Sequence, residues 1–328
     1  MPEGMDRATG THGAAGRLSK RPEEKKVSGK EKGKKFTRLN FDRSKKSREK
    51  GRKKMKVISI LNLKGGVAKT FTAANMAYEL WKRGEKVLLF DNDKQGNLSK
   101  AYNRYDAETV APVTKLLTGD WYEFEDLCQH TEYEGLDIIT ANMSLFGAAW
   151  NLTRDESEEQ TGRYQSLLAS EISAYFAASL KKETLCNLEM SVREYYDYCI
   201  IDNPPDLGIN VLNALEISDE VIVPVKICED ALEGLEIVAG QIEDVKVLNP
   251  SLTLKGILVT IYQNTEGEAA GLEWLLQGKG GYPVLGKIRY SGKVAESSFV
   301  RKPIYEYSPR CAAAQDYKRF VAEYLKEK

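Results

Sequence analysis

The sequence predicts an α/β protein built on a doubly wound, mostly parallel and twisted sheet flanked by helices. One observation is a strand, a glycine turn and a helix in immediate succession over residues 56–84. Another is a pair of short apolar runs, residues 86–91 and 198–202, that each end in a carboxylate. Such continuous apolar runs are typical of parallel strands buried on both faces. The length of 328 residues suits one large sheet of this kind.

The first element begins in the stretch "KVISILNLKGGVAKT", residues 56–70. Its β-branched residues Val57, Ile58 and Ile60 predict a buried strand, and Gly65 with Gly66 predicts a turn. A helix is predicted behind the turn, because apolar residues recur at helical spacing until Gly84 ends the pattern. These helical residues are Ala73, Met76, Ala77 and Leu80.

The turn has the chemistry of an anion site. Paired glycines let backbone N–H groups point at a phosphate, and the helix N-terminus adds the positive end of its dipole. Lys69 is then placed to contact the β- and γ-phosphates of a nucleotide, and the hydroxyl of Thr70 is placed to ligate Mg²⁺.

The loop differs from the ordinary phosphate loop, since Leu63 and Ala68 stand where the pattern GxxxxGK[ST] has glycine. It fits the deviant form KGGVxKT, with Lys64 before the glycines, and so resembles the ParA/MinD/Soj group of ATPases, ParA/Soj partition proteins most of all. The resemblance implies ATP and Mg²⁺ as cofactors. We expect ATP binding to survive Ala68, whose methyl group is tolerated if the backbone there is near helical. The residues implied in nucleotide binding are Lys64, Gly65, Gly66, Val67, Ala68, Lys69, Thr70 and Phe71.

The resemblance also implies a role for Lys64 between two copies of the chain. This lysine lies too far back to grip its own γ-phosphate, and in the family it reaches across a dimer interface to the nucleotide of the partner. We therefore expect a homodimer that ATP assembles and hydrolysis releases, with Lys64, Lys69 and Asp93 as the catalytic residues.

Two carboxylates follow the apolar run "KVLLFD", residues 86–91. Carboxylates at strand ends of an α/β sheet lie at the edge where ligands bind. Asp91 and Asp93 fit the family pattern DxDPQGN, which implies that Asp93 positions the attacking water and that Asp91 lies near the Mg²⁺ shell. Lys94 replaces the proline of that pattern.

A third carboxylate ends the apolar run in "YDYCIIDNPPDLG", residues 196–208. This is a Walker B pattern, in which Asp202 would hold Mg²⁺ through water. Pro204 and Pro205 exclude a helix immediately afterwards. Asp206 stands where the family has serine, and its role cannot be predicted from the sequence.

Further strands are predicted at residues 136–140, 220–225, 254–262 and 282–288, with a helix near Val113–Leu117 and helical sequence over 153–193. With the C-terminal stretch from Lys293, the resemblance covers nearly all of residues 55–328. We therefore predict one ATPase domain over 55–328.

Residues 1–54 differ from this domain in charge. They contain 19 Lys and Arg against 7 Asp and Glu, a net charge of +12, whereas residues 55–328 have a net charge of −12. Few large apolar residues occur there, so we predict a disordered polybasic tail. It is either an arm for DNA or an artefact of translation, with Met55 as the true start.

The implied partners are non-specific DNA, bound by the ATP dimer, and a ParB-like activating protein. Solvated surface charge is the alternative interpretation of the candidate DNA contacts Arg289, Lys293, Arg301, Lys302 and Arg310. Scattered cysteines and the absence of a signal peptide or an apolar run of about 18 residues indicate a cytoplasmic protein, associated with the nucleoid when ATP is bound.

Two other functions remain open from the sequence. A MinD-like membrane-associated ATPase would need an amphipathic C-terminal helix, but the apolar positions of residues 315–328 favour core packing, so no membrane contact is expected. A regulatory protein could instead use ATP as a clamp with little turnover.

Overall fold

The computed structural model describes residues 54–121, 123–154, 171–178, 191–228, 231–279 and 281–326. These residues belong to one compact unit, Gly51–Lys328. The predicted tail, apart from Lys54, lies outside the described residues. Residues 155–170 and 179–190 of the stretch predicted to be helical also lie outside them.

The described strands form one sheet of eight, in the order β3-β4-β2-β5-β1-β6-β7-β8. Every neighbouring pair is parallel except β3 and β4, which are antiparallel. The predicted fold class is thereby confirmed. The strands are β1 (Lys56–Ile60), β2 (Val87–Asp91), β3 (Cys128–His130), β4 (Leu136–Ile139), β5 (Tyr198–Asp202), β6 (Glu220–Val225), β7 (Thr253–Tyr262) and β8 (Val284–Arg289).

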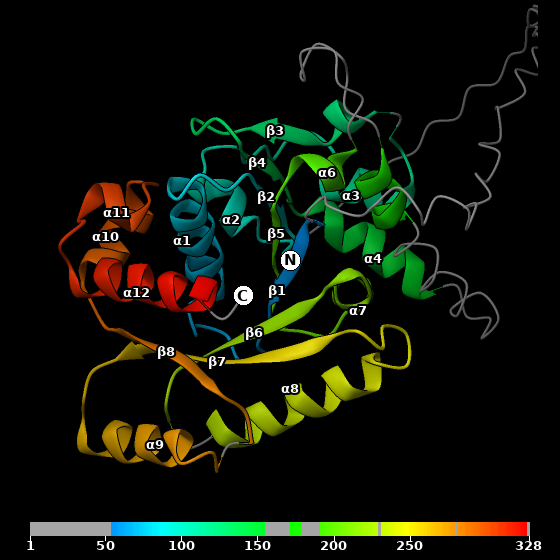
Figure 1. Ribbon diagram of the computed structural model, residues 1–328. Helices are drawn as coiled ribbons and strands as arrows, with labels where there is room; N and C mark the ends of the chain where they lie inside the picture. Colours follow the sequence, from blue (N-terminus) through cyan, green and yellow to red (C-terminus); the bar gives the residue numbers. More distant parts are fainter. Residues whose placement is uncertain are drawn as a thin grey trace, which may run out of the picture. The chain divides into compact units, whose positions relative to one another are not determined.

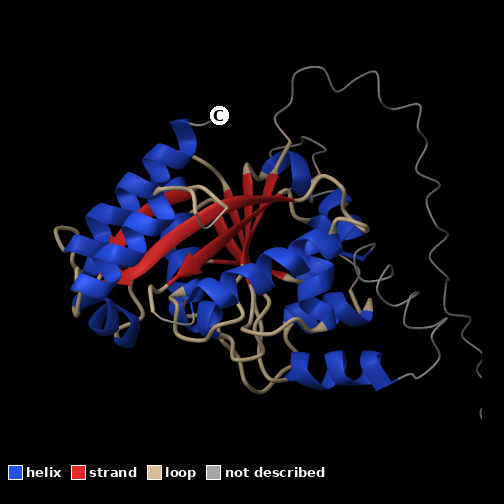
Figure 2. Ribbon diagram, turned by 90° about the horizontal axis from the view of Figure 1, so that it is seen from below, coloured by secondary structure: helices blue, strands red, loops and turns tan. Residues whose placement is uncertain are grey.

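Helices cover both faces of the twisted sheet (Figures 1 and 2). One face packs against α1, α2, α11 and α12, and the other against α3, α4, α6, α7, α8 and α9. The helix bounds are α1 (Lys69–Lys82), α2 (Asn97–Ala101), α3 (Pro112–Thr118), α4 (Ser144–Arg154), α6 (Val192–Tyr195), α7 (Ile209–Ile217), α8 (Ala231–Val245), α9 (Glu266–Leu276), α10 (Lys293–Phe299), α11 (Ile304–Tyr307) and α12 (Ala312–Lys326), with a short 3₁₀ turn at Phe124–Asp126.

Successive strand residues contribute to opposite faces, as the pleat requires. In β1, Val57 packs in the core beneath α3 and α7, whereas Ile58 packs beneath α1 and α12. All five residues of β5 are buried, which confirms the prediction of a strand covered on both faces.

The last described helix, α12, packs its apolar face into the core. Tyr317, Phe320, Val321 and Tyr324 are buried, and the hydroxyl groups of Tyr317 and Thr72 lie 2.9 Å apart. The predicted core packing is confirmed, and this face is not available to a lipid surface. No helix in the described part of the chain is both long and apolar enough to cross a bilayer.

The parallel strands bring the predicted carboxylates to one edge. Asp202 at the end of β5 is in register with Asp91 on β2 and with Ile60 on β1. Because the loop after β1 starts beside Asp202, this edge holds the glycine turn and both strand-end carboxylates.

Candidate functional site

The loop between β1 and α1 is anchored by buried polar side chains. The Asn62 amide donates to the Pro224 carbonyl at 2.7 Å, and its oxygen accepts from the backbone N–H of Lys64 at 2.8 Å. The Thr260 hydroxyl donates to the Val67 carbonyl at 3.0 Å. Asn62 and Thr260 belong to no motif, so the sequence analysis did not identify them. They fix the loop while Gly65 and Gly66 stay exposed.

The backbone of Ala68 does not meet the condition under which alanine would be tolerated without strain, a near-helical conformation. Its φ is 63° and its ψ 34°, in the left-handed region, immediately before the first turn of α1. This conformation costs an L-residue with a Cβ atom about 1–2 kcal/mol. Ala68 is therefore tolerated with strain, and the position is one that glycine adopts freely.

Lys69 is buried at the N-terminus of α1, and its ammonium group donates to the Lys64 carbonyl at 3.0 Å. Burial lowers the pKa of Lys69, while the carboxylates of Asp202 and Asp93 act in the opposite direction. A desolvated ammonium group held against a glycine loop is suited to binding phosphate oxygens.

Asp202 is a buried carboxyl group at the end of β5. It is 1% exposed, and neither carboxylate oxygen has a hydrogen-bond partner within accepted geometry among the described residues. Burial raises its pKa well above the usual carboxyl range, and Asp91 raises it further, whereas the nearby Thr70 hydroxyl and Lys69 lower it. A buried carboxylate beside a hydroxyl is the oxygen donor set that Mg²⁺ takes together with phosphates, so Asp202 and Thr70 fit such an ion.

Asp91 has a different environment. Its carboxylate accepts from the Ser99 hydroxyl at 2.6 Å, the Ser99 N–H at 2.8 Å and the Asp93 N–H at 3.2 Å. Burial raises the pKa of Asp91 to about 6, although these hydrogen bonds oppose the rise. Asp91 therefore holds the start of α2, next to the position predicted for the metal.

Asp93 lies on the loop after β2 and lines the cavity described below. Its carboxylate accepts from the Gln95 N–H at 2.9 Å. Gly96 has a φ of 62°, and a Cβ atom there would lie 2.5 Å from the Tyr105 ring and 2.6 Å from the Ala141 carbonyl oxygen. Only glycine fits this turn, which sets the position of Asp93.

Three asparagines join the loops after β1, β2 and β5. The buried Asn92 amide donates to the Asn203 side-chain oxygen at 2.9 Å, and the Asn203 amide donates to the Ile60 carbonyl at 3.3 Å. Asn210 donates to the Asn92 carbonyl at 2.9 Å. Neither the spacing nor the motifs of the sequence indicated this network.

A cavity of about 730 Å³ brings these loops together. It is lined by the glycine turn, by the loop after β2, by Pro204–Asp206, and by Ser297 and Ser298 of α10 with Arg301, Lys302 and Pro303 after it. The two departures from the family pattern meet at its wall, where the Lys94 ammonium lies 3.5 Å from the Asp206 carboxylate. The positive charge of Lys94 thus offsets the negative charge that Asp206 adds near the phosphate loop.

Lys64 is exposed and is not among the residues that line this cavity. Its ammonium group lies 3.1 Å from the Cys228 sulfur. The side chain is thus accessible to solvent, and its action on the nucleotide of a second copy stays a prediction.

The five predicted DNA contacts fall into three groups. Arg289 makes a bidentate ion pair with Asp316 at 2.8 and 2.9 Å, and Lys293 pairs with Glu296 at 2.8 Å. Arg301 and Lys302 line the cavity, and Arg310 is exposed away from it. These residues do not act as one basic patch.

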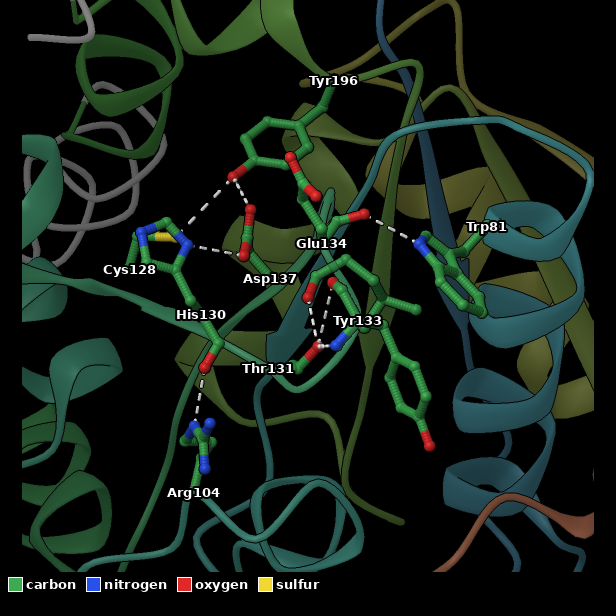
Figure 3. A network of polar contacts seen from close by, with 10 residues as sticks. Trp81, Arg104, Cys128, His130, Thr131, Tyr133, Glu134, Asp137 and Tyr196 are labelled. Atoms are coloured by element: carbon green, nitrogen blue, oxygen red, sulfur yellow. Dashed lines mark hydrogen bonds and ion pairs between the residues drawn. The ribbon is translucent and has the colours of Figure 1, made fainter. Parts of the chain in front are cut away.

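A separate cluster of Cys128, His130, Asp137 and Tyr196 lies at the β3–β4 edge (Figure 3). Asp137 accepts from the Tyr196 hydroxyl at 2.6 Å and lies 2.8 Å from His130 Nδ1. The Cys128 sulfur faces the Tyr196 hydroxyl at 3.8 Å, and burial raises the pKa of its thiol well above the usual range. A neutral thiol is a poor nucleophile, and these contacts join β3, β4 and Tyr196.

The model of the AAA domain family matches residues 55–254. The chromosome partitioning protein ParA of Caulobacter vibrioides is 31% identical over 273 residues, which cover 83% of this chain and 94% of that protein. The sporulation initiation inhibitor protein Soj of Bacillus subtilis is 33% identical over 266 residues, 80% of this chain and 95% of Soj.

Solved structures give the same result. Cobyrinic acid a,c-diamide synthase from Mycobacterium smegmatis, with bound ATP analogue and magnesium, matches with a TM-score of 0.64 and 26% identity over 83% of this chain and 95% of that one. The septum site-determining protein MinD of Pyrococcus horikoshii, complexed with Mg-ADP, has a TM-score of 0.61 and 22% identity over 83% and 97% of the two chains; at that identity the likeness concerns the fold alone.

Sheet order, glycine turn and strand-end carboxylates together define a phosphate-loop nucleotide-binding protein of the deviant Walker class. The coverage and the sequence identity of the matches then define the family within this class. This chain belongs to the ParA/MinD family of partitioning ATPases.

Proposed function

We propose that this protein is an ATP-dependent dimerising ATPase that acts in the segregation of chromosome or plasmid DNA. One observation carries the proposal: Lys69, Thr70 and Asp93 line a single cavity, at the edge where the unpaired carboxylate of Asp202 ends β5. Positioning and charge neutralisation are most of what phosphoryl transfer requires.

Each residue has a distinct role in this proposal. The exposed N–H groups of Gly65 and Gly66 and the ammonium of Lys69 bind the phosphates. Thr70 and Asp202 hold Mg²⁺, which supplies charge neutralisation at the β- and γ-phosphates when it is bound. Asp93, whose carboxylate is oriented by the Gln95 N–H, positions the attacking water.

The dimer follows from the placement of Lys64. Its side chain is exposed, and in this proposal it approaches the nucleotide of a second copy, where its charge would act in trans. A triphosphate that contacts both subunits adds binding energy only to the dimer, so ATP shifts the monomer–dimer equilibrium.

The ATP dimer would bind DNA non-specifically through phosphate contacts. Of the five predicted contacts, Arg310 is the one that neither lines the cavity nor belongs to the ion pairs of Arg289 and Lys293. A ParB-like partner would stimulate hydrolysis and so release the protein. This cycle places the protein in the cytoplasm, on the nucleoid while ATP is bound. The relatives named as ParA and Soj support this assignment.

The test measures DNA binding and phosphate release in one series. A labelled duplex of arbitrary sequence is titrated with protein in ATP or in ADP, using the full chain and a chain that starts at Met55. We expect binding in ATP only, and Asp93→Ala should bind DNA persistently while releasing at least about tenfold less phosphate, since its water is no longer positioned. Equal binding in ADP, or unimpaired phosphate release by Asp93→Ala, would contradict the proposal.

A further inference from the structure

The segment from α10 to α11 forms a second wall of the nucleotide cavity. Ser297, Ser298, Arg301, Lys302 and Pro303 line it together with the phosphate loop. No motif of the sequence analysis placed this segment at the nucleotide.

This wall is fixed to the helix that follows the phosphate loop. The Ile304 N–H donates to the side-chain oxygen of Asn75 on α1 at 3.2 Å. The Tyr78 hydroxyl donates to Glu306 at 3.2 Å, and the Tyr78 and Tyr305 rings stack with centroids 5.3 Å apart. These contacts hold the wall against α1, the helix that begins at the phosphate loop.

Arg301 occupies a strained position in the wall. Its φ is 51°, and its N–H donates to the Ser298 carbonyl at 3.2 Å, while the Lys302 N–H donates to the Ser297 carbonyl at 3.0 Å. This is the left-handed turn that ends a helix and that glycine normally occupies. Among the described non-glycine residues with positive φ, Ala68 and Arg301 both line this cavity. Backbone strain of this kind collects at functional sites.

The charges of Arg301 and Lys302 are not used within the fold. Neither side chain makes a hydrogen bond or an ion pair with another described residue, whereas Arg289 and Lys293 are both paired with carboxylates. The cavity is lined by more cations than carboxylates, which favours a polyanion: Lys69, Lys94, Lys100, Arg301 and Lys302 against Asp93 and Asp206.

We propose that Arg301, supported by Lys302, binds phosphate oxygens of the nucleoside triphosphate and is a nucleotide-binding residue instead of a DNA contact. A guanidinium group binds phosphate through paired N–H donors, which repays the strain of the left-handed backbone. The inference rests on the proposed function, because it requires the cavity to accept a triphosphate.

The experiment separates this role from a structural one by using Arg301→Gly. Glycine removes the charge and relieves the strain, so the nucleotide-free variant should unfold at the same or a higher temperature than the wild type. Its Kd for Mg-ATP, measured by displacement of a fluorescent ATP analogue, should rise about tenfold or more, as expected for the loss of a charged hydrogen bond. Arg301→Lys should retain part of the affinity, and Arg319→Ala, on the exposed side of α12, should leave the Kd unchanged.

The outcomes are distinguishable. A wild-type chain that binds no ATP would overturn the proposed function itself. If the wild type binds ATP and Arg301→Gly has an unchanged Kd for Mg-ATP, this inference alone is overturned. If Arg301→Gly loses affinity for DNA only, Arg301 is a DNA contact and this inference is overturned. An Arg301→Gly variant that melts at a lower temperature would contradict the strain argument, in which case the Kd of Arg301→Lys decides whether the charge acts on the nucleotide.

Discussion

At the scale of single residues, Ala68 shows how backbone geometry and chemistry compete in the phosphate loop. The turn requires a left-handed residue directly before Lys69, since the chain must fold back before α1 begins. Alanine adopts that conformation only with strain. The hydrogen bonds of Asn62 and Thr260 anchor the loop and hold Ala68 in this conformation despite the strain. The strain is stored where phosphate is proposed to bind.

Ala68→Gly should therefore stabilise the nucleotide-free protein. Relief of about 1–2 kcal/mol of strain is partly offset by the entropy that glycine loses on folding, so the free energy of unfolding should rise by about 0.5–1 kcal/mol. Urea denaturation measures it. The matched control is Ala77→Gly within α1, which should lower the free energy of unfolding by about 1 kcal/mol or more. Destabilisation by Ala68→Gly would show that the strain is not real.

The spacing of residues in the sequence predicted the candidate site residues but not the buried asparagines that fix the loops around them. Lys69, Thr70 and Asp202 were identifiable because a turn or a strand end fixes where they lie. Asn92 and Asn203 act through tertiary hydrogen bonds between segments 111 residues apart, a distance over which no periodic pattern extends. Buried amides of this type can be identified only from the three-dimensional structure.

At the scale of elements, the loop from β2 to α2 determines where Asp93 lies. Its path depends on Gly96, which is closely approached by the Tyr105 ring and the Ala141 carbonyl. The Asp91 carboxylate then holds the N-terminal turn of α2 through Ser99. The loop is thus a fixed support for Asp93, even though Lys94 replaces the proline expected there.

Gly96→Ala tests this support. The added Cβ atom must displace the loop, so ATP turnover should fall at least about tenfold, with a smaller change in ATP affinity, because positioning of the water depends on Asp93. Gly84→Ala is the control, since Gly84 has a φ of 92° but no atom within 4 Å of the added Cβ. It carries the same kind of backbone strain and should retain turnover. An equal loss of turnover in both variants would refute a specific role for the loop.

The sequence predicted the buried, continuously apolar strands and not β3 or α2. β1, β2, β5 and β6 were evident because both faces are covered and their runs are continuously apolar. β3 has three residues, polar and at the sheet edge, and α2 has five. Without a continuous apolar run, elements of that length contain too few residues for a pattern to appear.

At the scale of the whole molecule, the proposed function couples the nucleotide cavity to the association of two copies. The sheet places Lys69, Asp93 and Asp202 at one edge, and in the proposed function the exposed Lys64 acts on the nucleotide of a second copy. Fold class and family followed from the sequence, whereas the pairing of Arg289 and Lys293 and the placement of Arg301 did not, since ion pairs between distant segments leave no local pattern.

The most direct test of the central claim is sedimentation velocity of the purified chain with Mg²⁺ and either ATP or ADP, alongside Lys64→Ala. The wild type should sediment as a dimer in ATP and as a monomer in ADP. Lys64→Ala should stay monomeric in ATP while binding ATP with an affinity within about threefold of the wild type, since Lys64 does not line its own cavity. A Lys64→Ala variant that still dimerises in ATP, or a wild type whose sedimentation is the same in both nucleotides, would contradict the account.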